Sequence, residues 1–507
     1  MTRTRMFFLN SMAAGIYQIV ILIVGFITPR IMIQTYGSEV NGLISSITQF
    51  INYFNLVEAG LSGAAIYALY EPLAKKEKKI ISGIVNATNR FYCQSGVIFS
   101  ILLIGLSIIY PIFIKSHEIN YLEMLILVLI LGASGVIEFF SLGKYRALLT
   151  ANQELYVISI ASSIYQILSV IVIAIMAYFH FSVVLVRAVS LIPVFVRSFI
   201  LYFYVKIHYK YLDKKEKPIN QALNKRWDAM FLNILGAIHS GVPMILATIL
   251  TDLVQVSIFG VYNIVLSGIG GIVGIFNNGL SSSFGNIIAM GEKKILQKSY
   301  NEFEYMYYVI ITIMYGTCLV MILPFIKLYT RNISDVNYCI NSLAILITLN
   351  GIFYNLKTPQ GMLVISAGHY RETRWQTVTQ GVLSIILGSI FGYYAGISGI
   401  VLGSICSNLY RDIDLMFYVP RKIVGTRVTT TFKRELLVII NIVIIYNVFQ
   451  FYNIPIENYL QWIVYATIVF LISILVVLIT SLIFDSGTLK DVLKRIKYLF
   501  NRVERNN

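Results

Sequence analysis

Residues 7–34 read FFLNSMAAGIYQIVILIVGFITPRIMIQ, an apolar stretch that contains a single charged side chain, Arg30. A helix that crosses the hydrocarbon core of a bilayer needs about 20 mostly apolar residues, and this stretch is longer than that. Arg3 and Arg5 precede it, as basic residues do in a signal peptide. In a signal peptide small residues follow the apolar stretch and mark the cleavage site, but here the small residues Ser11, Ala13 and Ala14 stand near its beginning. We therefore expect an uncleaved first transmembrane helix.

The rest of the chain has the same character. Of its 507 residues, 57% are hydrophobic and only 13% are charged, whereas soluble domains carry about 25% charged residues. A soluble protein of this length could not cover its surface with so few ionic groups. The formal charge of +16 is also found in nucleic-acid-binding proteins, but here the cations stand in short clusters between apolar stretches. Membrane lipid, and no nucleic acid, is the expected surrounding.

About fourteen apolar stretches follow one another along the chain, joined by short polar connections. The expected spans are 7–34, 42–71, 83–114, 121–147, 153–179, 182–207, 228–250, 256–287, 301–328, 337–366, 373–395, 397–419, 435–453 and 458–484. The sequence thus predicts an all-α polytopic membrane protein with about 14 transmembrane helices.

The distribution of lysine and arginine predicts the orientation, because cytoplasmic loops concentrate these residues. When every second connection between spans is assigned to the same side of the membrane, that side receives 31 of the 40 lysines and arginines, in clusters such as 75–79 and 206–226. The opposite side receives only Lys115, Lys327 and Arg331. We therefore expect an even number of helices and both termini in the cytoplasm.

An internal repeat is indicated by short matches in the same order. Phe8-Leu9-Asn10 recurs as Phe231-Leu232-Asn233, and an aromatic-glycine pair follows each at the same spacing and is expected to close the helix: Tyr36-Gly37 and Phe259-Gly260. The expected parts are a six-helix lobe at 1–226, a second at 227–425, transmembrane helices 13 and 14 within 426–485, and a basic amphipathic cytoplasmic tail at 486–507.

The second helix of each half carries polar residues at helical spacing. In the first half they include Asn52, Asn55 and Glu58, and in the second half Asn277. Such a stripe either packs against a neighbouring helix or lines a water-filled cavity between two lobes. The carboxylate of Glu58 favours the cavity, and Glu138 of the fourth span is expected to line it too.

Ionisable side chains at membrane depth are costly and are therefore candidates for function. Those expected inside the bilayer, away from the basic connections, are Arg30, Glu58, Arg90, Glu138, Arg187, Arg197, Lys357 and Arg411. Six are cations, and arginine binds phosphate or pyrophosphate through a bidentate fork.

We therefore predict that substrate is bound by Arg30, Arg90, Arg187, Arg197 and Lys357. Arg30 and Arg187 lie nearer a helix end, where snorkelling or structural pairing is the alternative. Arg411 is expected to pair with an aspartate beside it. The carboxylates Glu58 and Glu138 either hold the arginines in position when the site is empty or couple transport to protons or sodium.

No cofactor or metal is expected. The four cysteines form no CxxC pair, and the chain contains no GxxxxGK[ST] phosphate loop. Transport would then draw on a Na⁺ or H⁺ gradient or on the supply of the substrate, and not on bound ATP.

The segments YGSEVNGL at 36–43 and QFINYFNLVEAGL at 49–61 resemble the Wzx-type polysaccharide flippases of the multidrug/oligosaccharidyl-lipid/polysaccharide (MOP) exporter superfamily. The resemblance implies a MATE-like, V-shaped bundle of two six-helix lobes with two extra C-terminal helices. It implies that the protein flips an undecaprenyl-pyrophosphate-linked oligosaccharide between the leaflets of a bacterial plasma membrane by alternating access. The product would be a cell-surface polysaccharide such as capsule or O-antigen, and polysaccharide assembly proteins would be partners.

Two other functions remain open. A MATE-like drug or cation antiporter would need surplus carboxylate, which the cationic excess disfavours. A membrane oligosaccharide polymerase or ligase would present a long external loop, and no outward connection here exceeds about a dozen residues. We expect a transporter and not an enzyme.

Overall fold

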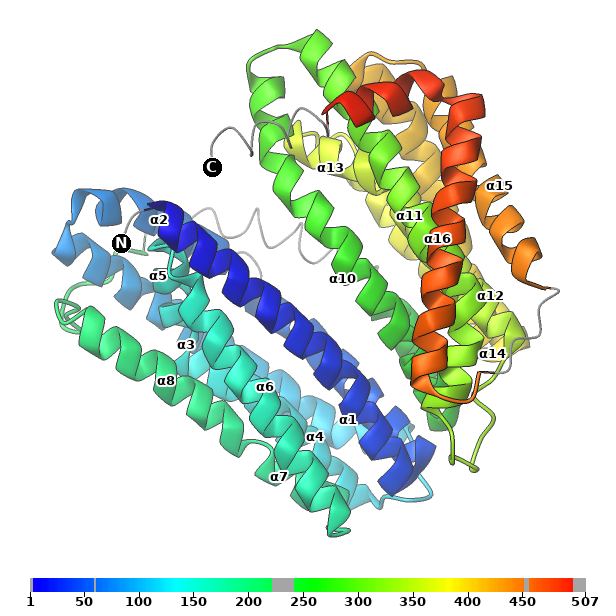
Figure 1. Ribbon diagram of the computed structural model, residues 1–507. Helices are drawn as coiled ribbons and strands as arrows, with labels where there is room; N and C mark the ends of the chain where they lie inside the picture. The colour runs from blue at the N-terminus through cyan, green and yellow to red at the C-terminus, as the bar shows by residue number, and fades with distance from the viewer. Residues whose placement is uncertain (1–2, 59–60, 221–240, 451–455, 496–507) are drawn as a thin grey trace. The chain divides into compact units, whose positions relative to one another are not determined.

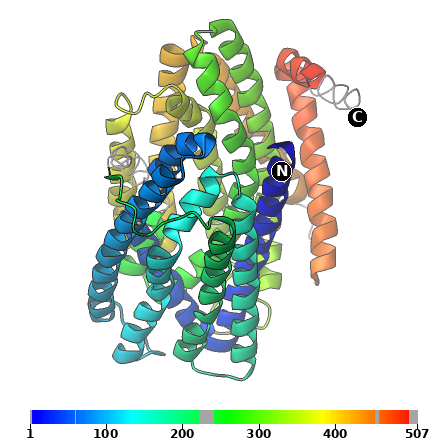
Figure 2. The same ribbon diagram turned by 90° about the vertical axis from the view of Figure 1, so that its left-hand side faces the viewer.

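The computed structural model describes residues 3–58, 61–220, 241–450 and 456–495, except for the side chains of 3, 4, 7 and 275–282. Within these residues every regular element is a helix. The chain divides into two compact units, unit 1 at Met1–Gly260 and unit 2 at Val261–Asn507. In each unit the long helices lie side by side along a common direction (Figure 1 and Figure 2).

Unit 1 begins with a long helix that bends sharply. The elements of unit 1 are α1 Arg3–Phe54, the short η1 Asn55–Glu58, α2 Leu61–Lys75, α3 Lys78–Phe113, α4 Tyr121–Ser141, α5 Gly143–Ala151, α6 Leu155–Tyr178, α7 Val183–Val189 and α8 Ile192–His208. Helix α1 bends at Gly37, whose φ of 84° lies in the left-handed region that glycine adopts without steric cost. The chain continues through an apolar helix at Gly241–Leu250.

Unit 2 holds the second half of the chain. Its elements are α10 Leu253–Ala289, which begins in unit 1, α11 Lys293–Tyr329, α12 Asn341–Leu356, α13 Thr358–Ser366, α14 Arg374–Val419, the π-helical turn η3 Pro420–Val424, α15 Val428–Gln450 and α16 Tyr459–Phe484. The start of α10 is capped by Asp252, whose side chain accepts from the Gln255 backbone N–H at 2.7 Å.

The described residues contain nine helical runs that are long and apolar enough to cross a membrane. Two of these runs, Phe8–Lys75 and Arg374–Val424, are long enough for two crossings of about 20 residues each and contain the bends at Gly37 and Gly396. The runs expose apolar side chains, as at Ile101 in Lys78–Phe113, which is 64% exposed. The predicted all-α polytopic membrane protein is confirmed, and the count of about 14 crossings stays a prediction.

Two features of the predicted repeat can be located. The boundary expected between 226 and 227 and the tripeptide at 231–233 lie outside the described residues. Gly37 interrupts its helix as expected. Gly260 does not, because it lies inside α10, and the cap at Asp252 sets where that helix begins. The expectation that Phe259-Gly260 closes a helix was therefore wrong.

Glycines let α4 and α5 approach α3 closely in unit 1. A Cβ on Gly135 would lie 2.7 Å from the Phe99 ring, and a Cβ on Gly143 would lie 2.1 Å from the Tyr92 ring. Both contacts are shorter than any real Cβ contact, so only glycine fits. The close packing at Gly143 fixes the ring of Tyr92, which becomes important for the site below.

The two arms of α14, residues 374–394 and 397–419, pack against each other through small residues. The bend lies at Ala395 and Gly396, where φ of Gly396 is 56°. A Cβ on Gly403 would lie 2.3 Å from the Gly388 backbone nitrogen, and a Cβ on Gly399 would lie 1.9 Å from a backbone oxygen of the other arm. Such small-xxx-small contacts are typical of membrane helix pairs.

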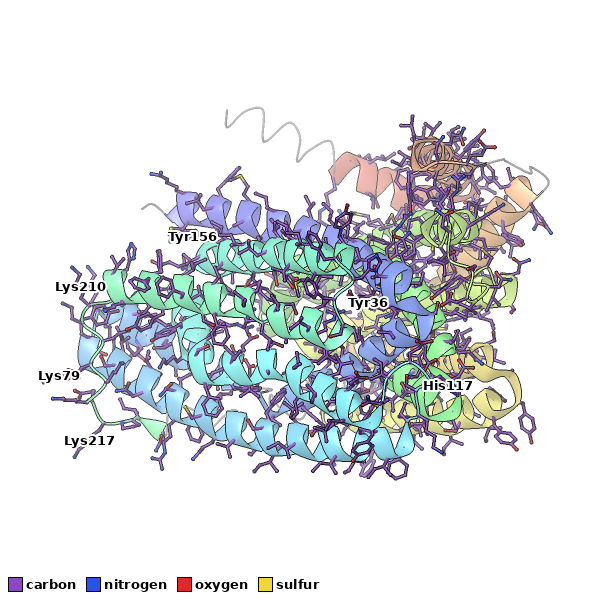
Figure 3. All side chains as sticks on the ribbon, turned by 90° about the horizontal axis from the view of Figure 1, so that it is seen from below. Tyr36, Lys79, His117, Tyr156, Lys210 and Lys217 are labelled. Atoms are coloured by element: carbon purple, nitrogen blue, oxygen red, sulfur yellow. The ribbon has the colours of Figure 1, made fainter. Side chains whose placement is uncertain are left out.

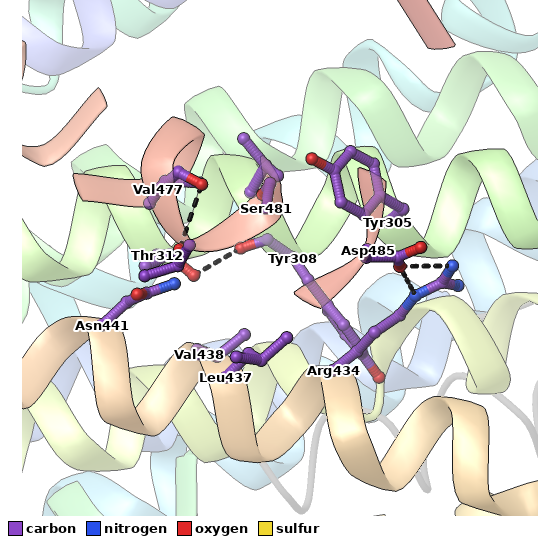
Figure 4. A pocket seen from close by; sticks show the side chains of 12 residues that line it. Tyr305, Tyr308, Thr312, Arg434, Leu437, Val438, Asn441, Val477, Ser481 and Asp485 are labelled. Atoms are coloured by element: carbon purple, nitrogen blue, oxygen red, sulfur yellow. Dashed lines mark hydrogen bonds and ion pairs between the residues drawn. The ribbon is translucent and has the colours of Figure 1, made fainter. Parts of the chain in front are cut away.

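Arg434 joins the last two long helices to α11. Its guanidinium donates to Glu304 Oε2 and Asp485 Oδ2 at 2.9 Å each, and to the Thr488 hydroxyl at 3.1 Å. Figure 4 shows the pair with Asp485. Residues of α11, α15 and the chain after α16 thus meet at one buried cation.

The C-terminal segment is helical over its described part, 486–495. Leu489 and Val492 are buried, with Tyr305 of α11, in a small apolar cluster. These two positions on the apolar face of the tail therefore contact protein. Residues 496–507 are outside the described part.

The basic connections of unit 1 gather at one end of its helices. Lys79, Lys210 and Lys217 lie at that end, and Tyr36 and His117 lie toward the other (Figure 3). This is the arrangement that the charge distribution predicts for cytoplasmic loops.

We predict that Gly403→Ala destabilises the protein by about 1–3 kcal/mol, because the added methyl overlaps backbone that cannot move without opening the two arms of α14. Thermal unfolding of the purified protein in detergent measures this. The control is Gly361→Ala in α13, where a Cβ meets nothing within 4 Å. Equal melting temperatures for the two variants would contradict the packing described.

We predict that the loop containing Lys214 is cytoplasmic. In a variant without native cysteines, Lys214→Cys should react with a membrane-impermeant maleimide only after cells are permeabilised. Glu118→Cys, from the connection at the opposite end of unit 1, should react in intact cells. Labelling of the Lys214 position from outside would reverse the orientation.

Candidate functional site

The centre of the candidate site is Glu138 of α4, which bridges two arginines. Arg197 of α8 donates through Nη2 to Glu138 Oε2 at 3.0 Å, and Arg146 of α5 donates through Nη1 to Glu138 Oε1. Hydrogen bonds between ionised partners are about twice as strong as neutral ones. One carboxylate therefore holds two guanidinium groups that come from different helices.

The break between α4 and α5 brings Arg146 back to Glu138. These residues are separated by eight positions, which in a helix corresponds to a rise of about 12 Å. The chain leaves α4 at Leu142, a residue with φ of −106°, and α5 starts at Gly143. Because helical side chains point toward the N-terminus, the long arginine side chain covers the remaining distance.

A second carboxylate adjoins this pair. Glu58, in the short η1 helix, accepts a hydrogen bond from the Tyr92 hydroxyl at 2.7 Å and interacts electrostatically with Arg146. Arg197, Glu138, Arg146, Glu58 and Tyr92 therefore form one group, called the charged cluster below. Its members come from five elements of unit 1.

The charged cluster is only partly shielded. The side chain of Arg197 is 14% exposed, that of Glu138 is 26% exposed and that of Arg146 is 40% exposed. Of these three side chains, that of Arg146 is therefore the most exposed.

Two arginines keep a hydrogen-bond donor unused. Arg197 stacks over the Tyr165 ring at 4.9 Å, and Tyr165 also interacts electrostatically with Arg187 of α7. The Nε atoms of both arginines are buried and have no hydrogen-bond partner among the described residues. A buried donor without a partner is costly, so these donors are open to an acceptor from a ligand or from water.

The structure brings together only some of the predicted residues. Glu58, Glu138 and Arg197 belong to the charged cluster, and Arg187 adjoins it through Tyr165. These four lie in four different elements of unit 1. The prediction that they act on substrate stays a prediction.

The other predicted cations are not members of the charged cluster. Arg90 is exposed on α3, and Arg30 is half-buried on α1. Lys357 lies in unit 2, where its Nζ donates to Asn408 Oδ1 at 2.6 Å. Arg411 pairs with Asp414, one of the two aspartates expected for it.

The predicted polar stripe can be followed only in unit 1. Asn52 and Asn55 are exposed, in α1 and η1, and Glu58 is half-buried at the end of the stripe. Asn277 lies in α10, but its side chain is outside the described residues.

Sequence reasoning missed Arg146, Tyr92 and Tyr165. Arg146 stands beside Lys144 near the end of the expected span 121–147, where basic residues are common, but α5 continues to Ala151. The only available signal was its position eight residues after Glu138. Tyrosines within apolar helices give no comparable signal.

Comparisons by sequence find no matching family model and no match among curated proteins. Solved structures do match. A multidrug resistance MATE family transporter of the MOP superfamily, in an inward-facing conformation, has a TM-score of 0.67 and 14% identity, covering 83% of this chain and 99% of that one. The lipid II flippase MurJ, in an inward closed conformation, has a TM-score of 0.62 and 15% identity, covering 94% and 98%. A MOP superfamily transporter from Pyrococcus furiosus has a TM-score of 0.58 and 14% identity, covering 81% and 96%.

At such low identity the likeness concerns the fold. It extends over nearly the whole length of each of these solved chains. These neighbours are transporters and flippases, and none is described as an enzyme. The protein is therefore a multi-pass membrane protein with the transporter fold found in MATE proteins and in MurJ.

Proposed function

We propose that the protein flips an undecaprenyl-pyrophosphate-linked oligosaccharide from the inner to the outer leaflet of a bacterial plasma membrane by alternating access. The observation that supports this proposal is the cationic surplus around Glu138. Among the described residues, Arg146 and Arg197 pair with Glu138, Arg187 adjoins them through Tyr165, and the cluster contains two carboxylates. In the same part of the chain, the Nε atoms of Arg187 and Arg197 have no hydrogen-bond partner. A pyrophosphate supplies the charge and the acceptor oxygens that this group lacks.

Glu138 is proposed to hold the arginines ready while no substrate is bound. It keeps the guanidinium of Arg197 beside Tyr165 and that of Arg146 at the exposed side of the cluster. A pyrophosphate would share or take over these donors, and Arg187 would add a further one. Since the arginines are already positioned, binding loses little side-chain entropy.

The likeness of the fold to a lipid flippase also supports a lipid-linked substrate. MurJ, which the chain resembles over 94% of its length, is described as a lipid II flippase. We propose that this chain also transports a lipid-linked substrate, and that the group attached to the lipid is an oligosaccharide. Polysaccharide assembly proteins would then receive the product outside.

A MATE-like drug or cation antiporter is the second candidate, and the TM-score of 0.67 to a MATE transporter favours it. A cationic drug would need carboxylates that are free to bind it. Glu138 is occupied by two arginines and Glu58 by Tyr92. Drug efflux by cells that express the protein would support this candidate over the flippase.

Coupling to Na⁺ or H⁺ is proposed to involve Glu58. It is the carboxylate of the cluster without a direct ion pair among the described residues, and the hydrogen bond that it accepts comes from the neutral hydroxyl of Tyr92. The exposed Asn52 and Asn55 precede it along the same stripe. An ion or proton reaching the stripe would therefore meet Glu58 before Glu138 if the stripe is the route of entry.

We predict that Arg197→Ala lowers the flipping rate about 10- to 150-fold, because a charge-assisted hydrogen bond is worth about 1.5–3 kcal/mol. Transport of a fluorescent polyprenyl-pyrophosphate-linked sugar into proteoliposomes measures the rate. Arg197→Lys keeps the charge but loses the planar fork, and we expect only partial recovery.

The matched comparison is Arg90→Ala, the same change at an exposed arginine of unit 1 outside the cluster, for which we expect a smaller loss. Size-exclusion chromatography checks that both variants remain folded. Full activity of folded Arg197→Ala would exclude the charged cluster as the substrate site. Unfolding of the Ala variant alone, with active Arg197→Lys, would assign Arg197 a structural role.

We predict that Glu58→Gln leaves the protein folded and changes the dependence of transport on pH or on sodium. The amide keeps the hydrogen bond with Tyr92 but carries no charge. Initial flipping rates across imposed Na⁺ and H⁺ gradients measure the effect. If both dependences equal those of the wild type, Glu58 positions Arg146 and does not couple transport.

A further inference from the structure

Unit 2 contains a polar pocket of about 430 Å³ where α11 and α15 begin. Its lining includes Lys294, Gln297, Lys298, Asn301, Thr426 and Thr430. The volume is in the range of small-ligand sites. None of the residues of the charged cluster belongs to it.

One wall of the pocket is fixed by Gln297. Its Nε2 donates to the backbone oxygens of Val424 and Gly425, at 3.1 Å each. Gly425 has a φ of 78°, in the left-handed region, and ends the π-helical turn. The turn that carries Thr426 is therefore held against α11 by side-chain and backbone contacts.

The floor of the pocket contains one acid, Glu304, and its charge is compensated. Arg434 donates to Glu304 Oε2 at 2.9 Å, and Tyr300 and Thr431 donate to Oε1 at 2.8 Å each. The Glu304 side chain is only 2% exposed. The floor therefore does not repel an anion as a free carboxylate would.

The rim carries positive charge that the protein does not neutralise. Lys294 and Lys298 are exposed and lie four residues apart on α11, so that their ammonium groups share one face and repel each other. Among the described residues, neither lysine takes part in an ion pair or a hydrogen bond. The first turns of α11 and α15 also present the positive ends of two helix dipoles.

Two exposed apolar side chains are next in sequence to residues that line the pocket. Ile295, beside Lys294, is 50% exposed, and Phe432, beside Thr431, is 55% exposed. A free phosphate ion makes no use of such neighbours. A phospholipid uses both, because its headgroup is anionic and its acyl chains are apolar.

We propose that this pocket binds the phosphate group of an anionic phospholipid from the adjacent leaflet. Lys294 and Lys298 hold the phosphate oxygens, and the hydroxyls of Thr426 and Thr430 offer further hydrogen bonds. The acyl chains lie along the exposed Ile295 and Phe432. This site is independent of the transported substrate and of the charged cluster in unit 1.

Native mass spectrometry of the full-length protein, titrated with phosphatidylglycerol or with zwitterionic phosphatidylcholine, tests the proposal. Lys294→Gln/Lys298→Gln keeps two polar side chains and removes both charges. Because each lysine near an anionic lipid surface contributes about fivefold in affinity, we expect about 25-fold weaker phosphatidylglycerol binding. Phosphatidylcholine binding should not change.

The control Lys210→Gln/Lys217→Gln removes two lysines at one end of unit 1 (Figure 3) and should keep the wild-type affinity. Equal phosphatidylglycerol affinity in the pocket variant and this control would overturn the proposal, as would equal wild-type affinity for the two lipids. Displacement of the lipid by millimolar inorganic phosphate would show that the occupant is a free phosphate and not a headgroup.

A second variant tests the same pocket in case the double lysine variant does not fold. Thr430→Val removes a hydroxyl from the exposed rim. A several-fold weaker phosphatidylglycerol affinity of this variant would support the pocket, and an unchanged affinity would count against it. The melting temperature without added lipid should equal that of the wild type.

Discussion

Every charge placed within the membrane-spanning part of this protein needs a partner, and that requirement determines which helices meet. A lone ion in hydrocarbon is costly, so helices carrying opposite charges associate where the charges pair. In unit 1 Glu138 ties α4 to α5 and α8. In unit 2 Arg434 ties α15 to α11 and to the chain after α16. Glycine contacts then allow the neighbouring backbones to approach.

The two groups of charges differ in how completely their donors are used. Arg434 places all five of its N–H donors near acceptors, namely Asp485, Glu304, Thr488 and the Asn301 backbone oxygen. Arg197 and Arg187 each retain a buried Nε without a partner in the described part of the chain. A saturated arginine has nothing to offer a ligand, whereas an unsaturated one gains by binding. This difference is the physical reason for assigning structure to Arg434 and function to the arginines near Glu138.

Hydropathy and charge made the class of fold predictable, since long apolar spans leave the backbone no alternative to helix in lipid. They also identified Glu58, Glu138 and Arg197, because a charge within an apolar span is conspicuous. They could not identify Arg146, which stands in a polar stretch and is brought to Glu138 by the break at Leu142. Nor could they distinguish Arg90, exposed on its helix, from Arg197, which is turned inward. Both are arginines inside expected spans, and they differ only in whether the rotation of the helix turns the side chain outward or inward.

The sequence also did not single out Glu304 and Arg434, because they lie near the ends of expected spans, where charged residues are common.

The pairing of Glu304 with Arg434 also has a consequence for the synthesis of the chain. The two residues are 130 positions apart, and a ribosome adding about 5–20 residues per second needs between about 6 and 26 s to reach the second after the first. During that interval α11 carries a carboxylate whose cation does not yet exist. Tyr300, one helical turn earlier, donates to the same carboxylate at 2.8 Å and is already present. The nascent helix therefore brings its own temporary partner, and arrival of Arg434 completes the attachment of the last two helices.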